Sequence, residues 1–597
     1  MSLTSASAGG PPSVLAPHPA TGSTAFRGIL LRMTFRHELH DLAADYWESV
    51  LTAFPTFATL LGDRRFDDRI EDVSAEAEDR LRATWRELLA RAEALDADGL
   101  GDDDKVTHGL LRTELALGVE QLGLRPAELA SDQMEGVHAG LLTSAPQVNA
   151  PSPESAAALV QRHRQIGGML DQAVERFRAG LAVGRTPARI AIDRSINQLD
   201  NYLASDLSTD PFVAMAGPPG GWDGEAAWRE ELADVARDVI RPGFRRYRDM
   251  LENELLPVAR PDDRAGLSWL GDDGAALYDA AVRQHTTLDD LGPEEIHRLG
   301  LAEVERLSGE YAEVGGRLFG TTGQADVFAR LLGDPALRYD DADQILSHVH
   351  HCVDSAWSLM GDWFGRLPEA PCDIQPVPEF MAADATAAYY FPPAADGSRP
   401  GVYCVNLHAP QERGRYETAS IAYHEAIPGH HLQLTIASEL TDLPSFQRFS
   451  LSNTAFAEGW ALYTERLADE MGLYENDLDR LGLLAGDSWR SCRLVVDTGL
   501  HALGWSRRQA IDFLVANVPA GIDHIEVEVD RYIAMPGQAL SYKVGQLEIQ
   551  RLRASAEAAA TPNGGFDVKG FHDVVLGSGT VSLPVLREIV AAWSSRA

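Results

Sequence analysis

One stretch of the chain reads His424-Glu425-Ala426-Ile427-Pro428-Gly429-His430-His431, and a later one reads Phe456-Ala457-Glu458-Gly459-Trp460. Glu458 follows His431 by 27 residues. Histidine and glutamate side chains can bind zinc, and a glutamate can also act as a general base. These stretches contain a His-Glu pair, a further histidine within two helical turns and a glutamate on a later helix. These two stretches therefore indicate both a helical fold and a metal-dependent chemistry.

The two histidines of the first stretch are too far apart for a regular zinc helix, in which they stand four residues apart on one face. A spacing of six or seven residues separates them by roughly 9–10 Å along a helix that rises ~1.5 Å per residue. Two imidazoles at that distance cannot both reach one zinc ion at ~2 Å. The helix must therefore bulge or break between His424 and the second histidine.

Pro428 and Gly429 supply the means of this break. Proline has no N–H to donate to the carbonyl of His424, and its ring clashes with that carbonyl. Glycine adopts backbone angles that are closed to other residues. The break can bring either His430 or His431 back toward His424. The alternative is a helix that simply ends at Pro-Gly and leaves surface histidines.

Glu458 stands among apolar residues on a predicted helix. A carboxylate in such surroundings is costly unless it is paired or bound to metal. Gly459 indicates close approach by another segment, which the helix of His424 would supply. The alternative is a buried ion pair with Arg466 or Arg490. Together the two stretches favour a zinc site.

Length, composition and net charge limit the classes of protein and partner that fit this chain. The 597 residues are 45% hydrophobic, enough for a large core, and their formal net charge is −37. The negative charge is typical of a well-solvated acidic surface and leaves open an attraction for cationic substrates. It argues against nucleic acid as a partner, because phosphate binding needs clustered lysine and arginine.

Cysteine usage and the first residues bear on the compartment. Four cysteines without CxxC spacing form neither a disulfide framework nor a thiolate zinc site, so we expect a cytoplasmic protein. Residues 1–25 lack the features of a signal peptide and are predicted to be a disordered leader. No run approaches ~18 apolar residues, so no membrane span is predicted.

The chain is predicted to be mainly α-helical. Apolar residues recur at helical spacing over 36–62, 75–96, 154–181, 224–257, 293–315, 340–362, 417–440, 453–471, 480–504 and 545–560. The clearest strand is 401–406, just before the predicted helix that carries His424. This strand could pair with an extended peptide. Loops are predicted at 97–104, 205–223, 366–401 and 560–566. Residues 26–597 are expected to form a single domain, either one body or two lobes, 26–265 and 266–597.

Several motifs resemble the bacterial family known as domain of unknown function 885. Its signature is His-Glu-x-x-Pro-Gly-His-x-x-Gln followed by a Glu-Gly-Trp-Ala-x-Tyr helix, and Gln433 stands in the glutamine place. The further matches are Thr59–Phe66, His285-Thr286-Thr287 with Glu303-Val304, Arg493–His501, Arg531-Tyr532 with Pro536–Ala539 and Tyr542-Lys543, and Phe571-His572-Asp573 with Leu583-Pro584. The likeness covers roughly residues 35–595.

The resemblance implies a large helical body with a deep central cleft and a small β element beside the metal helix. That family is thought to be zinc-peptidase-like, akin to helical gluzincin peptidases such as the angiotensin-converting enzyme and neurolysin groups. In the family pattern the residue after Pro-Gly-His varies. The resemblance thus implies Zn²⁺ ligands His424, His430 and Glu458, with His431 as the runner-up ligand. The missing four-residue spacing puts the ligand geometry in question.

Other residues are candidates for supporting roles. Asp497 stands on one helix face between Arg493 and His501, and this set is either a structural ladder or a group that, with Gln433, orients a ligand histidine. Tyr542 is a candidate oxyanion donor, and Lys543 or Arg531 could hold a substrate carboxylate. Tyr532 and His501 are further substrate-binding candidates, and the alternative for the whole set is ordinary packing.

We expect a zinc metallopeptidase, either a carboxypeptidase or an oligopeptidase, with a peptide as its partner and Glu425 as general base. The first alternative is a metal-dependent amidase that acts on a small non-peptide substrate. The second is a non-catalytic protein that binds a peptide or metabolite. Substrate identity, endo- or exo-action and oligomeric state stay open at this stage.

Overall fold

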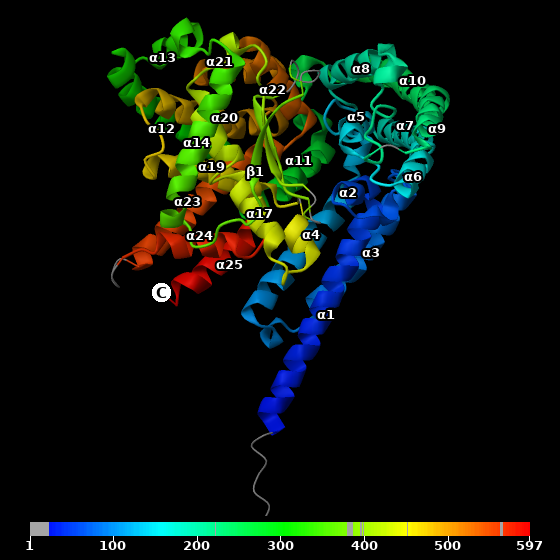
Figure 1. Ribbon diagram of the computed structural model, residues 1–597, viewed down its shortest axis with the longest axis horizontal. Coiled ribbons are helices and arrows are strands. Elements are labelled where there is room, and N and C mark those ends of the chain that lie inside the picture. The colour runs from blue at the N-terminus through cyan, green and yellow to red at the C-terminus, as the bar shows by residue number, and fades with distance from the viewer. Residues whose placement is uncertain are drawn as a thin grey trace, which may run out of the picture.

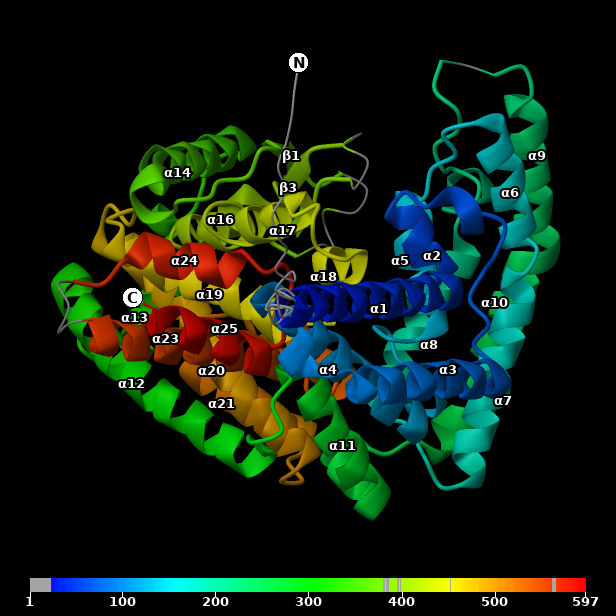
Figure 2. The same ribbon diagram turned by 90° about the horizontal axis from the view of Figure 1, so that it is seen from below.

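The computed structural model describes residues 23–220, 222–378, 382, 386–394, 397, 399–450, 452–560 and 565–596. Side chains are described from residue 35 onward. The predicted mainly α-helical class is confirmed, because helices account for most of this part of the chain and three short strands form a small sheet. In Figures 1 and 2 the helices gather in two groups, with α1, α3 and α4 running between them.

The first half of the chain forms one side of the molecule. Its α-helices are α1 (Ser23–Ala53), α2 (Pro55–Leu60), α3 (Ala75–Ala94), α4 (Asp102–Leu124), α5 (Val137–Ser144), α6 (Pro153–His163), α7 (Ile166–Ala182), α8 (Arg189–Ala204), α9 (Glu225–Val235) and α10 (Arg241–Met250). Helices α6, α7, α9 and α10 lie at the outer edge in both views (Figures 1 and 2).

The second half holds the candidate site. Its α-helices are α11 (Gly271–Thr286), α12 (Pro293–Phe319), α13 (Gln324–Gly333), α14 (Ala342–Trp363), α16 (Glu417–Glu425), α17 (His430–Glu439), α18 (Ser445–Phe449), α19 (Thr454–Glu470), α20 (Asp477–His501), α21 (Arg507–Asn517), α22 (Ile522–Ala534), α23 (Ser541–Ala560), α24 (Val568–Leu576) and α25 (Leu583–Ser594). Helices α19 and α23 pack along each other, and α20 packs on α12 and α16.

Helix α20 is the central support of this half. Asn476 caps its first turn, because the Asn476 side chain accepts hydrogen bonds from the amides of Leu478 and Asp479. Most of its residues are buried, including the run Leu494–Leu500. A helix that is apolar around much of its circumference belongs in a core. This burial explains why α20 can hold several side chains against α16, the helix that carries His424.

The sheet contains β1 (Cys372–Pro376), β2 (Ala388–Phe391) and β3 (Gly401–Val405), in the order β1-β3-β2. β3 runs parallel to β1 and antiparallel to β2. The predicted strand at 401–406 is therefore confirmed, but its proposed pairing with a peptide is wrong, because both of its edges are occupied. The predicted loop 366–401 was wrong where it covers β1 and β2.

Most predicted helices are present, and several are shorter or divided. Segment 36–62 becomes α1 and α2, segment 154–181 becomes α6 and α7, and segment 417–440 becomes α16 and α17. Helix α4 occupies most of a region with no predicted element, and it begins inside the predicted loop 97–104. Nine further helices of the described chain were missed: α5, α8, α11, α13, α18, α21, α22, α24 and α25.

Four hydrophobic clusters bear on the predicted domain organisation. One lies within residues 141–255 and another within 267–590, but a third joins Ala188 and Ala191 to residues 492–539. A fourth joins helix α1 to Phe446. The division into lobes 26–265 and 266–597 stays a prediction. Of the expected leader 1–25, residues 1–22 lie outside the described part and 23–25 begin α1.

Across the described residues, no helix has the length and apolar character needed to cross a membrane. The four cysteines are all free thiols.

Candidate metal centre

The helix break predicted at Pro-Gly is present. Helix α16 ends at Glu425 and α17 begins at His430. Ala426 and Gly429 both have non-helical backbone angles, with ψ of −104° and −128°. The amide of His431 donates to the carbonyl of Ala426 at 3.1 Å, which closes the turn. The break turns the chain so that His424 and His430 face each other, with ring centroids 4.8 Å apart.

Gly429 and Trp460 fix the break. A Cβ atom at Gly429 would lie 1.9 Å from the carbonyl oxygen of His424, so no larger residue fits there. The indole Nε1 of Trp460 donates to the carbonyl of Pro428 at 3.0 Å. This bond satisfies a buried carbonyl that the interrupted helix leaves without a partner. Trp460 therefore ties the helix of Glu458 to the break.

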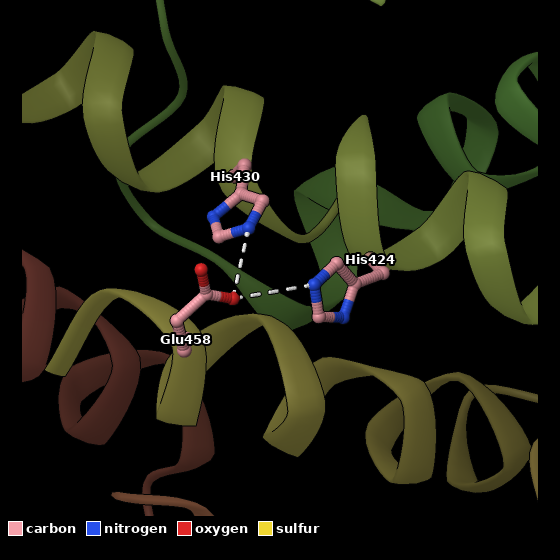
Figure 3. A group of neighbouring side chains, drawn as sticks. All are labelled: His424, His430 and Glu458. Carbon is pink, nitrogen blue, oxygen red and sulfur yellow. Dashed lines mark ion pairs between the residues drawn. The ribbon is translucent and has the colours of Figure 1, made fainter. Parts of the chain in front are cut away.

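Glu458 approaches the two histidines from α19. Its Oε2 lies 3.6 Å from Nε2 of His424 and 3.5 Å from Nε2 of His430. Figure 3 shows the carboxylate between the two rings, each of which comes from a different helix segment. One ligand atom from each residue lies within 4.8 Å of the other two.

Close packing of two helices sets the position of Glu458. A Cβ atom at Gly459 would lie 2.4 Å from Cα of Gly545, and one at Gly545 would lie 1.8 Å from the carbonyl oxygen of Ala455. Glycine at both positions thus lets the backbones of α19 and α23 touch. The close approach inferred at Gly459 from the sequence is present, but its partner is α23 and not the metal helix.

The electrostatics of the three groups are coupled. Burial disfavours a charged imidazole, but the carboxylates of Glu458 and Glu465 outweigh it and raise the pKa of His424 to about 9. Burial would likewise raise the pKa of Glu458, but the two histidines hold it well below its ordinary value. The site therefore favours an ionised carboxylate next to positive charge.

A zinc ion fits this arrangement. The distances of 3.5 and 3.6 Å are too long for hydrogen bonds, and Oε2 of Glu458 is buried without a hydrogen-bond partner. Two atoms bound to one tetrahedral zinc at ~2.0–2.2 Å lie roughly 3.4 Å apart. Two histidines and one carboxylate are the three-ligand set that leaves an open fourth position.

Glu465 is a supporting residue that the sequence analysis missed. Its Oε1 lies 2.8 Å from Nδ1 of His424, and its Oε2 accepts a hydrogen bond from Ser420 at 2.6 Å. The carboxylate is buried. A carboxylate on the far nitrogen of a ligand histidine fixes the ring's orientation and tautomer. The seven-residue spacing from Glu458, two helical turns along one face, was the available signal.

The neighbouring residues His431 and Gln433 point elsewhere. Nδ1 of His431 lies 2.8 Å from the hydroxyl of Tyr390 on β2, away from the group of three ligands. The side chain of Gln433 donates to the carbonyl of Phe456 at 3.2 Å. Gln433 therefore anchors the start of α19 and contacts no ligand, while His430 takes the metal-facing place.

The expected contact between Asp497 and a ligand histidine is not formed. The carboxylate of Asp497 accepts hydrogen bonds from the hydroxyl of Tyr278 and the amide of Gly537. Burial raises its pKa to about 7. His501 accepts from the amide of Leu267 and lies 2.9 Å from the carbonyl of Tyr532. Both ring nitrogens of His501 are thus occupied by backbone, so its substrate-binding role was wrong.

Lys543 cannot hold a substrate carboxylate. It is 1% exposed, and its ammonium group contacts Asp487 at 2.5 Å, Glu303 at 2.8 Å and Gln546 at 2.7 Å. All three donors of the ammonium group are used. The substrate-binding role predicted for Lys543 was therefore wrong. Its acidic partners lie on α12 and α20, far from Lys543 in the sequence, so the pairing could not be inferred from the sequence.

Tyr532 and Arg493 are also internal. The hydroxyl of Tyr532 donates to Glu528 at 2.7 Å and accepts from Trp489 and Arg493. Arg493 donates its second hydrogen bond to Glu528 at 2.8 Å. Tyr532 is therefore saturated and buried, contrary to its predicted contact with substrate. Arg493 contacts no ligand histidine, contrary to its predicted supporting role.

Three predicted residues stay available for chemistry. Among the described residues the carboxylate of Glu425 has no hydrogen-bond or ion-pair partner, and it lies near enough to affect the pKa of His424. The hydroxyl of Tyr542 likewise has no hydrogen-bond partner in the described chain. The side chain of Arg531 is 23% exposed and interacts with Glu528 and Gln538.

A cavity of about 490 Å³ lies apart from the three ligands. Its walls combine the ends of α4 and α11 with α7, α8 and the segment that follows α22, and they are mostly apolar. None of His424, His430 or Glu458 lines it. The deep cleft expected around the metal site therefore stays a prediction.

Comparison with known proteins gives a family and two similar structures. The structure described as "the putative lipoprotein from Colwellia psychrerythraea" matches with a TM-score of 0.87 and 27% identity, over 94% of this chain and 100% of that one. A "putative lipoprotein of unknown function from Shewanella oneidensis" matches with a TM-score of 0.72 and 19% identity, over 93% and 99%, which shows the fold alone. No curated protein matches. A family model described as "Bacterial protein of unknown function (DUF885)" matches residues 55–590.

Proposed function

The chain belongs to the bacterial DUF885 family, and from the geometry of its own side chains we propose that it is a zinc-dependent peptidase. The observation that carries this proposal is the convergence of His424, His430 and Glu458 on one point, next to a carboxylate that has no partner in the part of the chain that the structure describes. That free carboxylate, Glu425, distinguishes a catalytic arrangement from a purely structural zinc site, which is closed by four protein ligands.

His424, His430 and Glu458 would hold the metal, and Glu465 would keep the ring of His424 in place. Zinc in a site with an open position lowers the pKa of bound water and polarises a carbonyl group. Glu425, beside the first ligand, accepts the proton of the attacking water and passes it to the departing amine. Tyr542 donates a hydrogen bond to the oxygen on which negative charge develops.

Peptides are the proposed substrates, and two other functions share the same residues. A metal-dependent amidase would use the same acid–base groups on a small non-peptide amide. A non-catalytic binding protein would keep zinc and have no need of a free carboxylate at Glu425. The unpartnered state of Glu425 therefore favours an enzyme over a binding protein.

A metal assay followed by peptide digestion tests the proposal. Protein purified without chelator should contain about one zinc per chain, as one three-ligand site implies. A mixed peptide library analysed by mass spectrometry should yield defined fragments. Glu425→Gln should keep fold and zinc but lose activity by ~10²–10⁴-fold, because the nearly isosteric amide cannot accept a proton. Zinc without turnover of any peptide would favour the binding protein.

The compartment is a separate proposal. The four free thiols suit the expected reducing cytoplasm. The printed descriptions of the two similar structures name lipoproteins, which favours the cell envelope as the alternative. Fractionation of the native host with an antibody against this chain separates the two locations.

A further inference from the structure

Two guanidinium groups lie close to the ring of Tyr542, and a third interacts with this tyrosine electrostatically. The guanidinium carbon of Arg493 lies 4.5 Å from the ring centroid and that of Arg490 lies 5.9 Å from it. Arg531 lies within electrostatic reach of the same tyrosine. These residues come from α20, α22 and the start of α23. In a chain with a net charge of −37, such a concentration of positive charge calls for a reason.

The three arginines differ in how well they are paired. Arg493 donates to both Tyr532 and Glu528 and is buried. Arg531 shares Glu528 with it at a longer distance of 3.4 Å. Arg490 has no carboxylate within hydrogen-bond distance, because its nearest, Glu465, is 3.8 Å away and already engaged by His424 and Ser420.

Arg490 is the least satisfied of the three. Its Nη1 donates to the carbonyl of Gly486 at 3.2 Å, and its Nε is buried without a partner. The side chain is nevertheless 21% exposed. A buried N–H without a hydrogen-bond partner is costly, and a planar carboxylate is the group that guanidinium donors match best. The site therefore favours a carboxylate supplied by a ligand.

A short path connects Arg490 to the candidate metal centre. Nη2 of Arg490 lies 3.8 Å from Oε1 of Glu465, which in turn lies 2.8 Å from Nδ1 of His424. Two contacts and one imidazole ring thus separate Arg490 from Nε2 of His424. This route passes through the buried carboxylate of Glu465 and the ring of His424, so it bounds the separation of the two groups and is not itself a channel for substrate. An extended peptide spans ~3.3–3.6 Å per residue, so at most about three residues would cover that separation.

We propose that Arg490, with Arg531 beside it, binds the C-terminal carboxylate of a peptide substrate. This inference rests on the proposed peptidase function and narrows it to a carboxypeptidase that releases short C-terminal pieces. The acidic surface of the protein favours the terminal carboxylate over acidic side chains, because substrates rich in Asp and Glu are repelled. Arg490 would be a substrate-binding residue and would take no part in proton transfer.

The test compares one library of N-acetylated peptides in two forms, with a free C-terminal carboxylate and with a C-terminal amide. Wild type should cleave the free acids with a kcat/KM about 10- to 100-fold higher than the amides. The released fragments should be no longer than about three residues. Arg490→Gln should remove the preference by slowing cleavage of the acids alone, and Arg531→Gln should weaken it less.

A matched control lies on the same helix. Arg480 on α20 is paired with Asp469 at 2.9 Å, away from Tyr542. Arg480→Gln should keep the wild-type preference for free acids. Zinc content and melting temperature of each variant show whether it folds. If Arg490→Gln does not fold, the acid–amide comparison on wild type still decides whether the carboxylate subsite exists, and Arg490→Lys, which keeps the charge but not the planar donors, should weaken the preference if Arg490 forms it.

Calorimetry with the Glu425→Gln protein separates binding from turnover. One peptide in its free-acid form should bind about 10- to 100-fold more tightly than its amide. Equal cleavage and equal binding of both forms would overturn the carboxylate subsite while leaving the peptidase intact. A preference that survives Arg490→Gln would overturn the assignment to this residue. C-terminal amides whose last residue is Glu carry a carboxylate only on the side chain. If they are cleaved as fast as the free acids, the choice of the C-terminal carboxylate is wrong. Absence of any cleavage would instead defeat the peptidase proposal itself.

Discussion

At the scale of single residues, Glu465 fixes the ring of His424, the first of the proposed zinc ligands. Its carboxylate occupies Nδ1 at 2.8 Å and is itself held by Ser420. Glu465→Gln keeps the shape but removes the charge. We expect the affinity for zinc to fall by about 10- to 100-fold, as is typical when such a support is lost. Competition with a fluorescent chelator measures it, and Glu470→Gln on the exposed side of α19 serves as control. Unchanged affinity would remove Glu465 from the site.

Among the described residues the hydroxyl of Tyr542 has no hydrogen-bond partner, and positive charge lies close to its ring. A phenol in such surroundings is suited to donate a hydrogen bond to a developing oxyanion. Tyr542→Phe should lower kcat by ~10²–10³-fold and leave KM nearly unchanged, because this hydrogen bond forms mainly in the transition state. Steady-state kinetics on a cleaved library peptide provide the measurement. A wild-type kcat would transfer the role to Arg531, the other candidate with an exposed donor.

The sequence predicted correctly which side chains gather where the gathering depends on local pattern. His424, His430 and Glu458 gather as expected, because the Pro-Gly break between the histidines could be inferred from the chemistry of those two residues. Lys543, Tyr532 and His501 were placed wrongly, because their partners lie on helices distant in the sequence. A single sequence does not reveal such pairings. Glu465 could have been found from its helical spacing to Glu458.

At the scale of helices, Lys543 joins three elements. Its ammonium group pairs with Asp487 on α20 and Glu303 on α12, and all three meet at the start of α23. Lys543→Met should lower the free energy of unfolding by about 3 kcal/mol, since it leaves a buried charge without one of its partners. Urea denaturation at constant zinc measures this loss, with the exposed Lys105→Met as control. A change in KM without loss of stability would restore the substrate-binding role that the structure argues against.

Helix prediction succeeded where one face is apolar and failed where burial or length hides the pattern. Helices α3, α12 and α14 keep a polar outer face and were found nearly to their ends. Helices α21 and α22 were missed, because each is short and the turn between them offers little contrast in composition. Two π-helical turns were also not predicted, one between α9 and α10 and one directly after α10.

At the scale of the whole molecule, buried histidines make stability depend on pH. Burial lowers the pKa of six histidines to between about 3 and about 4: His138, His163, His285, His431, His501 and His572. Their ordinary pKa is 6.5, so between pH 6.5 and 4 the unfolded chain binds protons that the folded protein does not. Stability is therefore lost as the pH falls through this window. Burial raises the pKa of Glu114, Asp497 and Asp132 to about 7, 7 and 6, which opposes the trend.

We expect the free energy of unfolding to be lower at pH 5 than at pH 7. Comparison with His572→Gln isolates one contributor, because metal binding varies with pH in the same way in both proteins. The variant should show a smaller loss between the two pH values. His350→Gln, at an exposed histidine on α14, should keep the wild-type loss. An identical loss in His572→Gln and wild type would contradict the assignment.

The contact between Gly459 and Gly545 also has a consequence for how the family diverges. Neither residue touches a ligand atom, yet any side chain at either place would meet the backbone of the opposite helix. Gly429 is under the same restriction from the carbonyl of His424. In an alignment of natural relatives these three glycines should therefore vary as little as the histidines, and the two facing ones should be lost only together. If the three glycines are constant among relatives, the reason is that the neighbouring backbone lies too close for any side chain. That close packing positions the proposed zinc ligands, so it has to be kept together with them.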